Sequence, residues 1–290
     1  MNILYVTYAI NGLLMIALPL ALATYLTRRF RLGWRLFWIG AATFMLSQAL
    51  HIPFNFVVLN TFLADLLDPS AIRIENLVLA GILAGLSAGV FEEFARYFIY
   101  RWWAKDARSW RKGLLLGAGH GGIEAIIFGG LALYGYLQLV ALRNADLTTL
   151  VAPDQVAALR QQVTAYWSAP WYASLLGAVE RAFTIPAHLA LSVLILQVFV
   201  RKQSRWLWLA VVWHTVLDGV SVVSIRLWGV YVTEGLIGLT ALINLWIIFA
   251  LRQPEGEEPE REEADKQPFA FPSFPILEET SENLERTRYD

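Results

Sequence analysis

Seven long apolar runs constrain the fold of this chain more than any other feature of its sequence. Each is about 20 residues or longer, the length that crosses the hydrocarbon core of a bilayer. Backbone groups that face lipid have no water to bond, so each run is expected to be a helix. The sequence therefore predicts an all-α polytopic membrane protein with about seven transmembrane helices. The runs cover residues 3–26, 34–58, 76–99, 112–140, 171–200, 205–225 and 228–250.

The composition agrees with this class and excludes an ordinary soluble domain. Hydrophobic residues make up 57% of the 290 residues and charged residues only 16%, whereas a soluble domain carries about 25% charged residues. The charges are also segregated, because residues 251–290 hold 12 of the 24 acidic groups and 5 of the 23 basic ones. We expect one transmembrane domain over 1–250 and an acidic, disordered cytoplasmic tail over 251–290. We expect contacts with membrane lipid and no nucleic-acid partner.

Basic residues in the short connections predict the orientation in the cell membrane. The first, third and fifth connections together hold twelve Lys and Arg, and the other three hold four. Because basic connections stay in the cytoplasm, the N-terminus is expected outside and the C-terminus inside. The first run is too long for the core of a signal peptide and no basic residue precedes it, so we expect it to be retained as a span.

The longest connection, residues 141–170, contains a helical pattern of its own. Val156, Leu159 and Val163 recur at spacings that place them on one face of a helix. We expect this helix to lie on the outer membrane surface. A gate over a substrate path is the alternative interpretation.

Glycines recur at four-residue intervals in the third and fourth runs. Such stripes of small residues let helix backbones approach closely, so we expect these two helices to sit tightly together. The glycines are Gly81, Gly85 and Gly89 in the third run, and Gly113, Gly117 and Gly121 in the fourth.

Ionisable residues inside the apolar runs are the candidates for function. A charged group near the bilayer centre costs roughly 2.5–3.5 kcal/mol on insertion scales, so such residues usually face the bundle interior. In four adjacent runs they lie at similar depths from the cytoplasmic end, which predicts one polar site in that half of the bundle. His51 lies near the outer end of its run and is expected to remain outside this site. The predicted members are Glu92, Glu93, Arg96, His120, Glu124, Glu180, Arg181, His188, His214 and Asp218.

Two histidine–acid pairs share a helix face. His120 and Glu124 are four residues apart, as are His214 and Asp218, so each acid can orient the ring or join it as a ligand. Interhelical hydrogen bonding is the simpler explanation for any one such pair. Several motifs at one depth favour a functional site instead.

The double glutamate of the third run also has a predicted geometry. Glu92 and Arg96 are four residues apart, in the favourable order for an ion pair, whereas Glu93 points about 100° away. Two adjacent carboxylates do not both ionise easily in a low dielectric unless a cation compensates them. Glu180 and His188 are eight residues apart, about 80° around their helix, so both can face one cavity.

The order of these motifs resembles that of the YhfC family of intramembrane metalloproteases, in the CPBP superfamily with the PrsW proteases and the type 2 CAAX prenyl proteases. The resemblance covers about 76–225. The spacing of the first motif is EExxR, as in YhfC-like and PrsW-like chains, rather than the EExxxR of the CAAX enzymes. The matching residues are Glu92, Glu93 and Arg96, then His120 and Glu124, then His188, and finally His214 and Asp218.

This resemblance implies a four-helix catalytic core and a peptidase that cleaves a membrane-associated protein or peptide. Glu92 or Glu93 would activate the attacking water, and His188 and His214 would bind a metal or hold that water directly. Asp218 would orient His214 or complete the site.

The remaining residues would support this chemistry. His120 and Glu124 would add a ligand or an outer shell, while Arg96 and Arg181 would balance charge. The chain has no cysteine, so a metal such as Zn²⁺ would need imidazole and carboxylate ligands. A metal-free glutamate–histidine water site agrees equally well with the sequence. The expected metal ligands are His120, His188 and His214.

Two other functions remain open at this stage. Chains of His, Glu and Asp also relay protons in transporters, but the spans show no internal repeat of the kind common in carriers. A non-catalytic scaffold or immunity protein of the same superfamily is the other alternative. The complete set of acids and histidines disfavours it.

Overall fold

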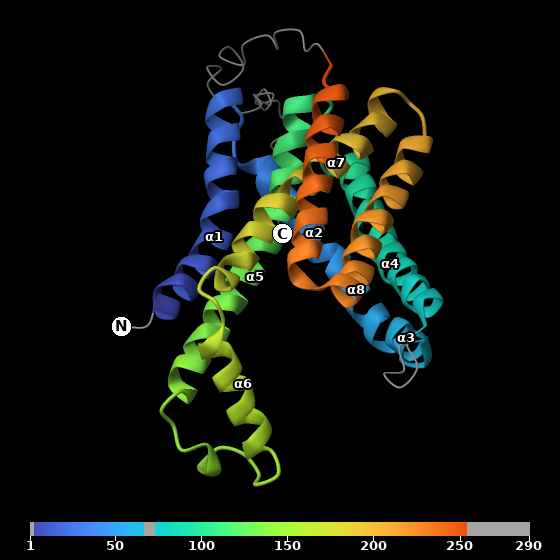
Figure 1. The fold of residues 1–290 in the computed structure, drawn as a ribbon. Helices are drawn as coiled ribbons and strands as arrows, with labels where there is room; N and C mark the ends of the chain where they lie inside the picture. The colour runs from blue at the N-terminus through green and yellow to red at the C-terminus, as the bar shows by residue number, and fades with distance from the viewer. Residues whose placement is uncertain (1–2, 67–72, 254–290) are drawn as a thin grey trace, which may run out of the picture. The chain divides into compact units, whose positions relative to one another are not determined.

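The computed structural model describes residues 3–66 and 73–253, and every regular element in these ranges is a helix (Figure 1). Six long helical stretches are apolar enough to cross a membrane, which confirms the all-α polytopic class. The predicted acidic tail falls almost entirely on 254–290, outside the described residues. The elements are α1 (Ile3–Phe30), α2 (Arg35–Phe54), the π-helical η1 (Asn55–Leu59), α3 (Asn60–Leu66), α4 (Ile74–Trp102), α5 (Trp110–Leu142), η2 (Leu147–Thr149), α6 (Val156–Ser168), η3 (Ala173–Leu175), α7 (Leu176–Val200) and α8 (Arg205–Ala250).

The 46-residue element α8 is two helices folded back on each other at Gly229. Nε1 of Trp213 donates a hydrogen bond of 2.8 Å to Oδ1 of Asn244, although a straight helix would separate them by about 46 Å. Gly229 has φ 76° and ψ 177°, a combination available essentially only to glycine. The two limbs correspond to the sixth and seventh predicted spans, so the described residues contain seven candidate spans.

The glycine stripes face different helices from those expected. A Cβ atom at Gly85 of α4 would lie 2.5 Å from the Thr215 carbonyl oxygen of α8, and one at Gly117 of α5 would lie 2.8 Å from the His188 carbonyl oxygen of α7. The prediction that the two striped helices pack on each other is therefore wrong. Each stripe presses its helix against another helix that carries a histidine motif, so the backbones that hold the candidate site are in close contact.

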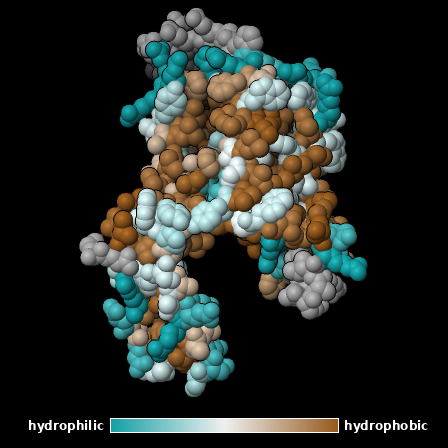
Figure 2. Space-filling view, viewed as in Figure 1, coloured by the Kyte–Doolittle hydropathy of each residue, from teal (hydrophilic) through white to brown (hydrophobic). Residues whose placement is uncertain are grey.

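The surface agrees with a membrane environment. Figure 2 shows a broad hydrophobic band across the helices, with hydrophilic residues at the two ends of this face. Large apolar side chains on different helices, such as Leu13, Leu50 and Trp246, are mostly exposed. Such an area is far larger than the apolar patches of soluble monomers, so we infer that it faces lipid.

The predicted helix of the longest connection is present as α6. Tyr166 of α6 stacks on Tyr8 of α1 with ring centroids 3.9 Å apart, and Trp167 donates to the Leu139 carbonyl oxygen at 3.1 Å. The 33 residues of α5 give it a length of about 50 Å, more than the roughly 30 Å of a bilayer core. In Figure 1 the far end of α5 and α6 extend beyond the neighbouring helices. Placement of α6 at the membrane surface remains a prediction.

Candidate active site

A cavity of about 350 Å³ lies among α2, α4, α5, α7 and α8. Most of the predicted site residues line it, and Glu93, Arg96 and His120 are buried in contact with those that do. Residues of the motifs on α4, α5, α7 and α8 are therefore brought together around one cavity. The ionisable lining residues are His51, Glu92, Glu124, Glu180, Arg181, His188, His214 and Asp218.

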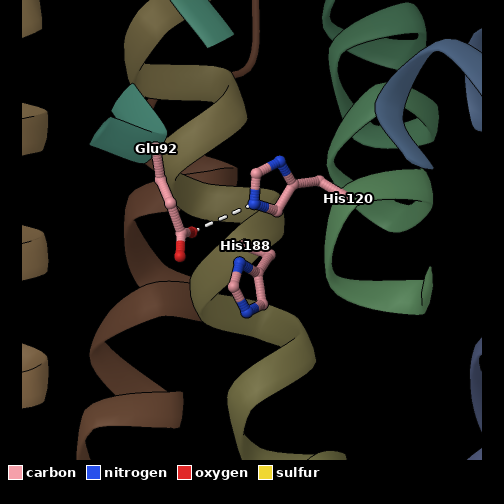
Figure 3. A group of neighbouring side chains, drawn as sticks. All are labelled: Glu92, His120 and His188. Atoms are coloured by element: carbon pink, nitrogen blue, oxygen red, sulfur yellow. Dashed lines mark hydrogen bonds and ion pairs between the residues drawn. The ribbon is translucent and has the colours of Figure 1, made fainter. Parts of the chain in front are cut away.

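Among the described residues, Glu92, His120 and His188 form a group that could hold a metal ion (Figure 3). One donor atom from each lies within 4.8 Å of the other two, and all three residues are buried. Nε2 of His120 lies 3.0 Å from Oε2 of Glu92, and the two imidazole rings stack with centroids 5.4 Å apart. Gln48 of α2 donates to the other Glu92 oxygen at 3.1 Å, which fixes the carboxylate.

Helix packing explains how the rings of this group come together. Gly121 is the last glycine of the α5 stripe that faces α7, and a Cβ atom there would lie 2.6 Å from Cδ2 of His188. Pro186 lies within α7 two residues before His188, and a proline removes a helical hydrogen bond and bends the helix. The absence of a side chain at Gly121 therefore leaves the space that the His188 ring occupies.

Arg96 connects the double glutamate to His188. Its Nη1 forms an ion pair with Glu93, and its Nη2 lies 2.9 Å from Nδ1 of His188 and 3.5 Å from Oε2 of Glu92. The closer carboxylate partner is therefore Glu93, three residues away, rather than Glu92 as the four-residue spacing predicted. A guanidinium only donates, so Nδ1 of His188 accepts and its Nε2 carries the proton.

Glu124 orients a different ring from the one expected. Oε2 of Glu124 lies 3.0 Å from Nε2 of His188, and Oε1 accepts a 2.6 Å hydrogen bond from Arg181. His120, four residues earlier, is bonded to Glu92 instead. The adjacent acid Glu180 also pairs with Arg181. The acid and the imidazole that it orients therefore come from neighbouring helices, not from one helix face.

His214 lies beside the group of three and is not part of it. Its Nδ1 lies 2.8 Å from Oε1 of Glu93, and its Nε2 lies 3.5 Å from Asp218 and 4.0 Å from Glu92. The expected His214–Asp218 pair is present. The bond to Glu93 holds the His214 ring away from the metal-ligand group. The third member of that group is therefore Glu92, where the sequence had suggested His214.

The donor set of Glu92, His120 and His188 fits a divalent metal ion. Two imidazoles and one carboxylate are a ligand set of catalytic zinc sites, and one donor atom of each residue lies within 4.8 Å of the other two. Arg96 already contacts two of the three groups. A metal ion on the same atoms would replace these contacts.

Three polar residues of the bundle were missed or misplaced by the sequence interpretation. His51 lines the same cavity, although its depth argued against this, and it is hydrogen-bonded to Ser87 at 3.1 Å and Asn55 at 2.9 Å. Gln48 was overlooked because only ionisable residues were considered in the apolar runs. Glu234 in the last span is buried, with Oε2 unpartnered among the described residues.

Comparison with known proteins assigns the chain to a family. The chain is 27% identical over 256 residues to the protein described as "Uncharacterized membrane protein YhfC" of Bacillus subtilis (strain 168), which covers 84% of this chain and 95% of the relative. No solved structure matches the chain. The family model of the YhfC intramembrane metalloproteases matches residues 14–253, which include Glu92, His120 and His188. The chain is thus a member of the YhfC intramembrane metalloprotease family.

Proposed function

We propose that this protein hydrolyses a peptide bond of a membrane-associated protein or peptide, using water activated beside Glu92, His120 and His188. The observation that supports this most directly is the buried group of one carboxylate and two imidazoles at the wall of a cavity inside an apolar helical bundle. Carboxylate and imidazole together accept and return a proton. A low-dielectric surrounding strengthens their effect on developing charge.

The contacts of Glu92 and Glu93 suggest different roles for the two glutamates. Glu92 lines the cavity and is the group proposed to accept the proton of the attacking water. Glu93 is fully buried and held by Arg96 and His214, so we assign it a positioning role. His214 already bonds Glu93 through Nδ1, so we propose that as the imidazolium it donates a hydrogen bond from Nε2 to the oxygen that becomes negative.

The metal-free and the metal-dependent form of this site use the same residues, but Glu92 would be a metal ligand in the second form instead of the base. When bound, a divalent metal such as Zn²⁺ on Glu92, His120 and His188 would supply a more acidic water and polarise the scissile carbonyl. Glu124 would then hold the His188 ring through Nε2, as it does in the described structure, while the metal would replace the contact between Arg96 and Nδ1.

The proposed orientation follows from the basic connections. The Lys and Arg residues that follow α1, α4 and α7 favour a cytoplasmic location for the C-terminal ends of these helices. The N-terminus of the chain would then lie outside. The proposed cleavage then takes place in the inner half of the bilayer.

The test uses the full chain in liposomes together with a detergent-solubilised pool of bacterial membrane proteins, in water enriched in ¹⁸O. Hydrolysis should create new C-termini that carry ¹⁸O and are identified by mass spectrometry. The variant Glu92→Gln should form them at least about 100-fold more slowly, because a general base contributes that much or more. Glu75→Gln, an exposed acid on the same helix, is the matched control and should match the wild type. Equal cleavage by Glu92→Gln, or no labelled termini from the wild type, would overturn the proposal.

A further inference from the structure

A second, shallower pocket lies at a basic end of the helices and shares no residue with the cavity at Glu92. Its volume is about 460 Å³, and it is lined by Arg101, Trp102, Lys105, Arg108 and Phe199. Three cationic side chains and two aromatic rings thus share one concave surface. It is built by the end of α4, the loop before α5 and the end of α7.

Arg108 is fixed in place as part of this pocket. Its guanidinium donates to the carbonyl oxygens of Tyr100 at 2.8 Å, Ala104 at 3.0 Å and Ala107 at 3.2 Å, and it lies 4.5 Å from the centre of the Phe199 ring. These partners are neutral, so they orient the positive charge without cancelling it. Partial burial lowers the pKa of Arg108, and an anionic ligand would offset this cost.

The other two cations are exposed and available. Arg101 donates to the Tyr97 hydroxyl at 3.3 Å, and within 3–66 and 73–253 neither Arg101 nor Lys105 has a carboxylate partner. Asp106, the acidic residue of the same loop, is paired with Arg35 at 2.8 Å. Arg101 and Lys105 therefore keep their charge without an ion-pair partner among the described residues.

The aromatic residues place the pocket at the edge of the membrane. Trp102 stacks on Phe98 with centroids 4.9 Å apart and planes 4° from parallel, and Trp102 and Trp103 are 58% and 56% exposed. Tryptophan is enriched at the level of the lipid headgroups. Basic pockets between helices at this level suit anionic headgroups.

We propose that this pocket binds the phosphate of an anionic phospholipid, with Arg101, Lys105 and Arg108 around the phosphate oxygens and Trp102 against the upper part of the lipid. Phosphate accepts several charge-assisted hydrogen bonds at once, which suits three converging cations. The aromatic surface beside it favours a lipid over a soluble phosphate ester. This proposal is independent of the hydrolytic activity.

The experiment measures lipid retention by the full chain. The protein is purified from nanodiscs of phosphatidylcholine with phosphatidylglycerol, and bound lipid is measured by native mass spectrometry during titration. The double variant Arg101→Ala/Lys105→Ala should bind phosphatidylglycerol about 25-fold more weakly, at about five-fold per charge. The control Arg28→Ala/Arg29→Ala removes two exposed charges from the last turn of α1, outside the pocket, and should retain wild-type affinity.

Each outcome is decisive. An equal loss in both double variants would mean that only general surface charge attracts the lipid, and the pocket would be rejected. If glycerol phosphate alone displaced phosphatidylglycerol at equal concentration, the ligand would be a soluble phosphate and the lipid assignment would fail. Both variants should unfold at the wild-type temperature in pure phosphatidylcholine, because the replaced side chains are exposed. This measurement excludes misfolding as the cause of lost binding.

Discussion

The guanidinium of Arg96 donates to Nδ1 of His188 across 2.9 Å, between two helices that are not neighbours in sequence. Because arginine has no acceptor, this contact leaves the proton of a neutral His188 on Nε2, which faces Glu124 at 3.0 Å. The ring is thus held by a donor on one side and an acceptor on the other. A metal ion bound to His188 would have to replace one of these two partners.

Removing one partner of the Arg96–Glu93 pair should destabilise the fold more than removing both. Both side chains are fully buried, and removing one partner of such a pair typically costs about 3–5 kcal/mol. We expect Arg96→Met to lower the free energy of unfolding by this amount, and Arg96→Met/Glu93→Met to recover most of it. Unfolding in detergent, analysed as a double-mutant cycle, checks this, and strictly additive losses would contradict it.

Metal binding should depend on the group of three donors. Equilibrium dialysis against Zn²⁺, followed by elemental analysis, should show the largest loss for His120→Ala and His188→Ala. Glu124→Gln should weaken binding about 10- to 100-fold, the usual effect of losing a residue that orients a ligand. His51→Ala is the matched control, since it lines the same cavity outside the group. A loss in His51→Ala as large as in His188→Ala would exclude the site.

Gly121 should be intolerant of a side chain. A methyl group there would lie 2.6 Å from the His188 ring, so the ring must leave Arg96 and Glu124 or the helices must separate, at about 1–3 kcal/mol. We expect Gly121→Ala to be less stable and to lose most of its hydrolysis. The control Gly130→Ala lies on the same helix with no atom within 4 Å and should be as stable as the wild type or slightly more so. Wild-type cleavage by Gly121→Ala would refute this packing argument.

The loop before α5 gives a prediction about pH. Hydrogen bonding to Arg35 lowers the pKa of Asp106 below its usual value, so the ion pair stabilises the fold above that usual value, near pH 4, and is lost as the pH falls through the lowered pKa. Both side chains are substantially exposed, so the effect is under about 1 kcal/mol. We expect Asp106→Asn to be slightly less stable than the wild type at pH 7. The two melting curves should converge below pH 3, and a constant difference would argue against the pair.

The long apolar helices and most of the ionisable residues around the cavity were predictable, because both depend on local properties of the sequence. Hydrophobic length identified the helices, and the cost of burying charge identified residues such as Glu92 and His214. Pairing across helices was not predictable, because it depends on which helices become neighbours. Glu124 shows this clearly: its spacing pointed to His120, but packing of α5 on α7 gave it His188.

The same limit explains the error about the glycine stripes. A four-residue repeat shows that a helix has a smooth face but carries no information about its partner. Gly85 therefore contacts α8 and Gly117 contacts α7, while the sequence suggested that the two stripes meet. Gln48 was missed for a different reason. A neutral amide inside an apolar run also marks a polar site, as its hydrogen bond to Glu92 shows, but only ionisable residues were considered.

The tight turn at Gly229 has a consequence for the synthesis of the protein. The hydroxyls of Ser224 and Thr233 lie 2.9 Å apart across this turn, so little chain remains to form a loop between the last two spans. Nε1 of Trp213 also reaches its acceptor, Oδ1 of Asn244, only after both limbs are made. We infer that the two limbs enter the bilayer as one hairpin. Because His214 and Ile237 line the same cavity from opposite limbs, its wall is completed only when the final span has been translated.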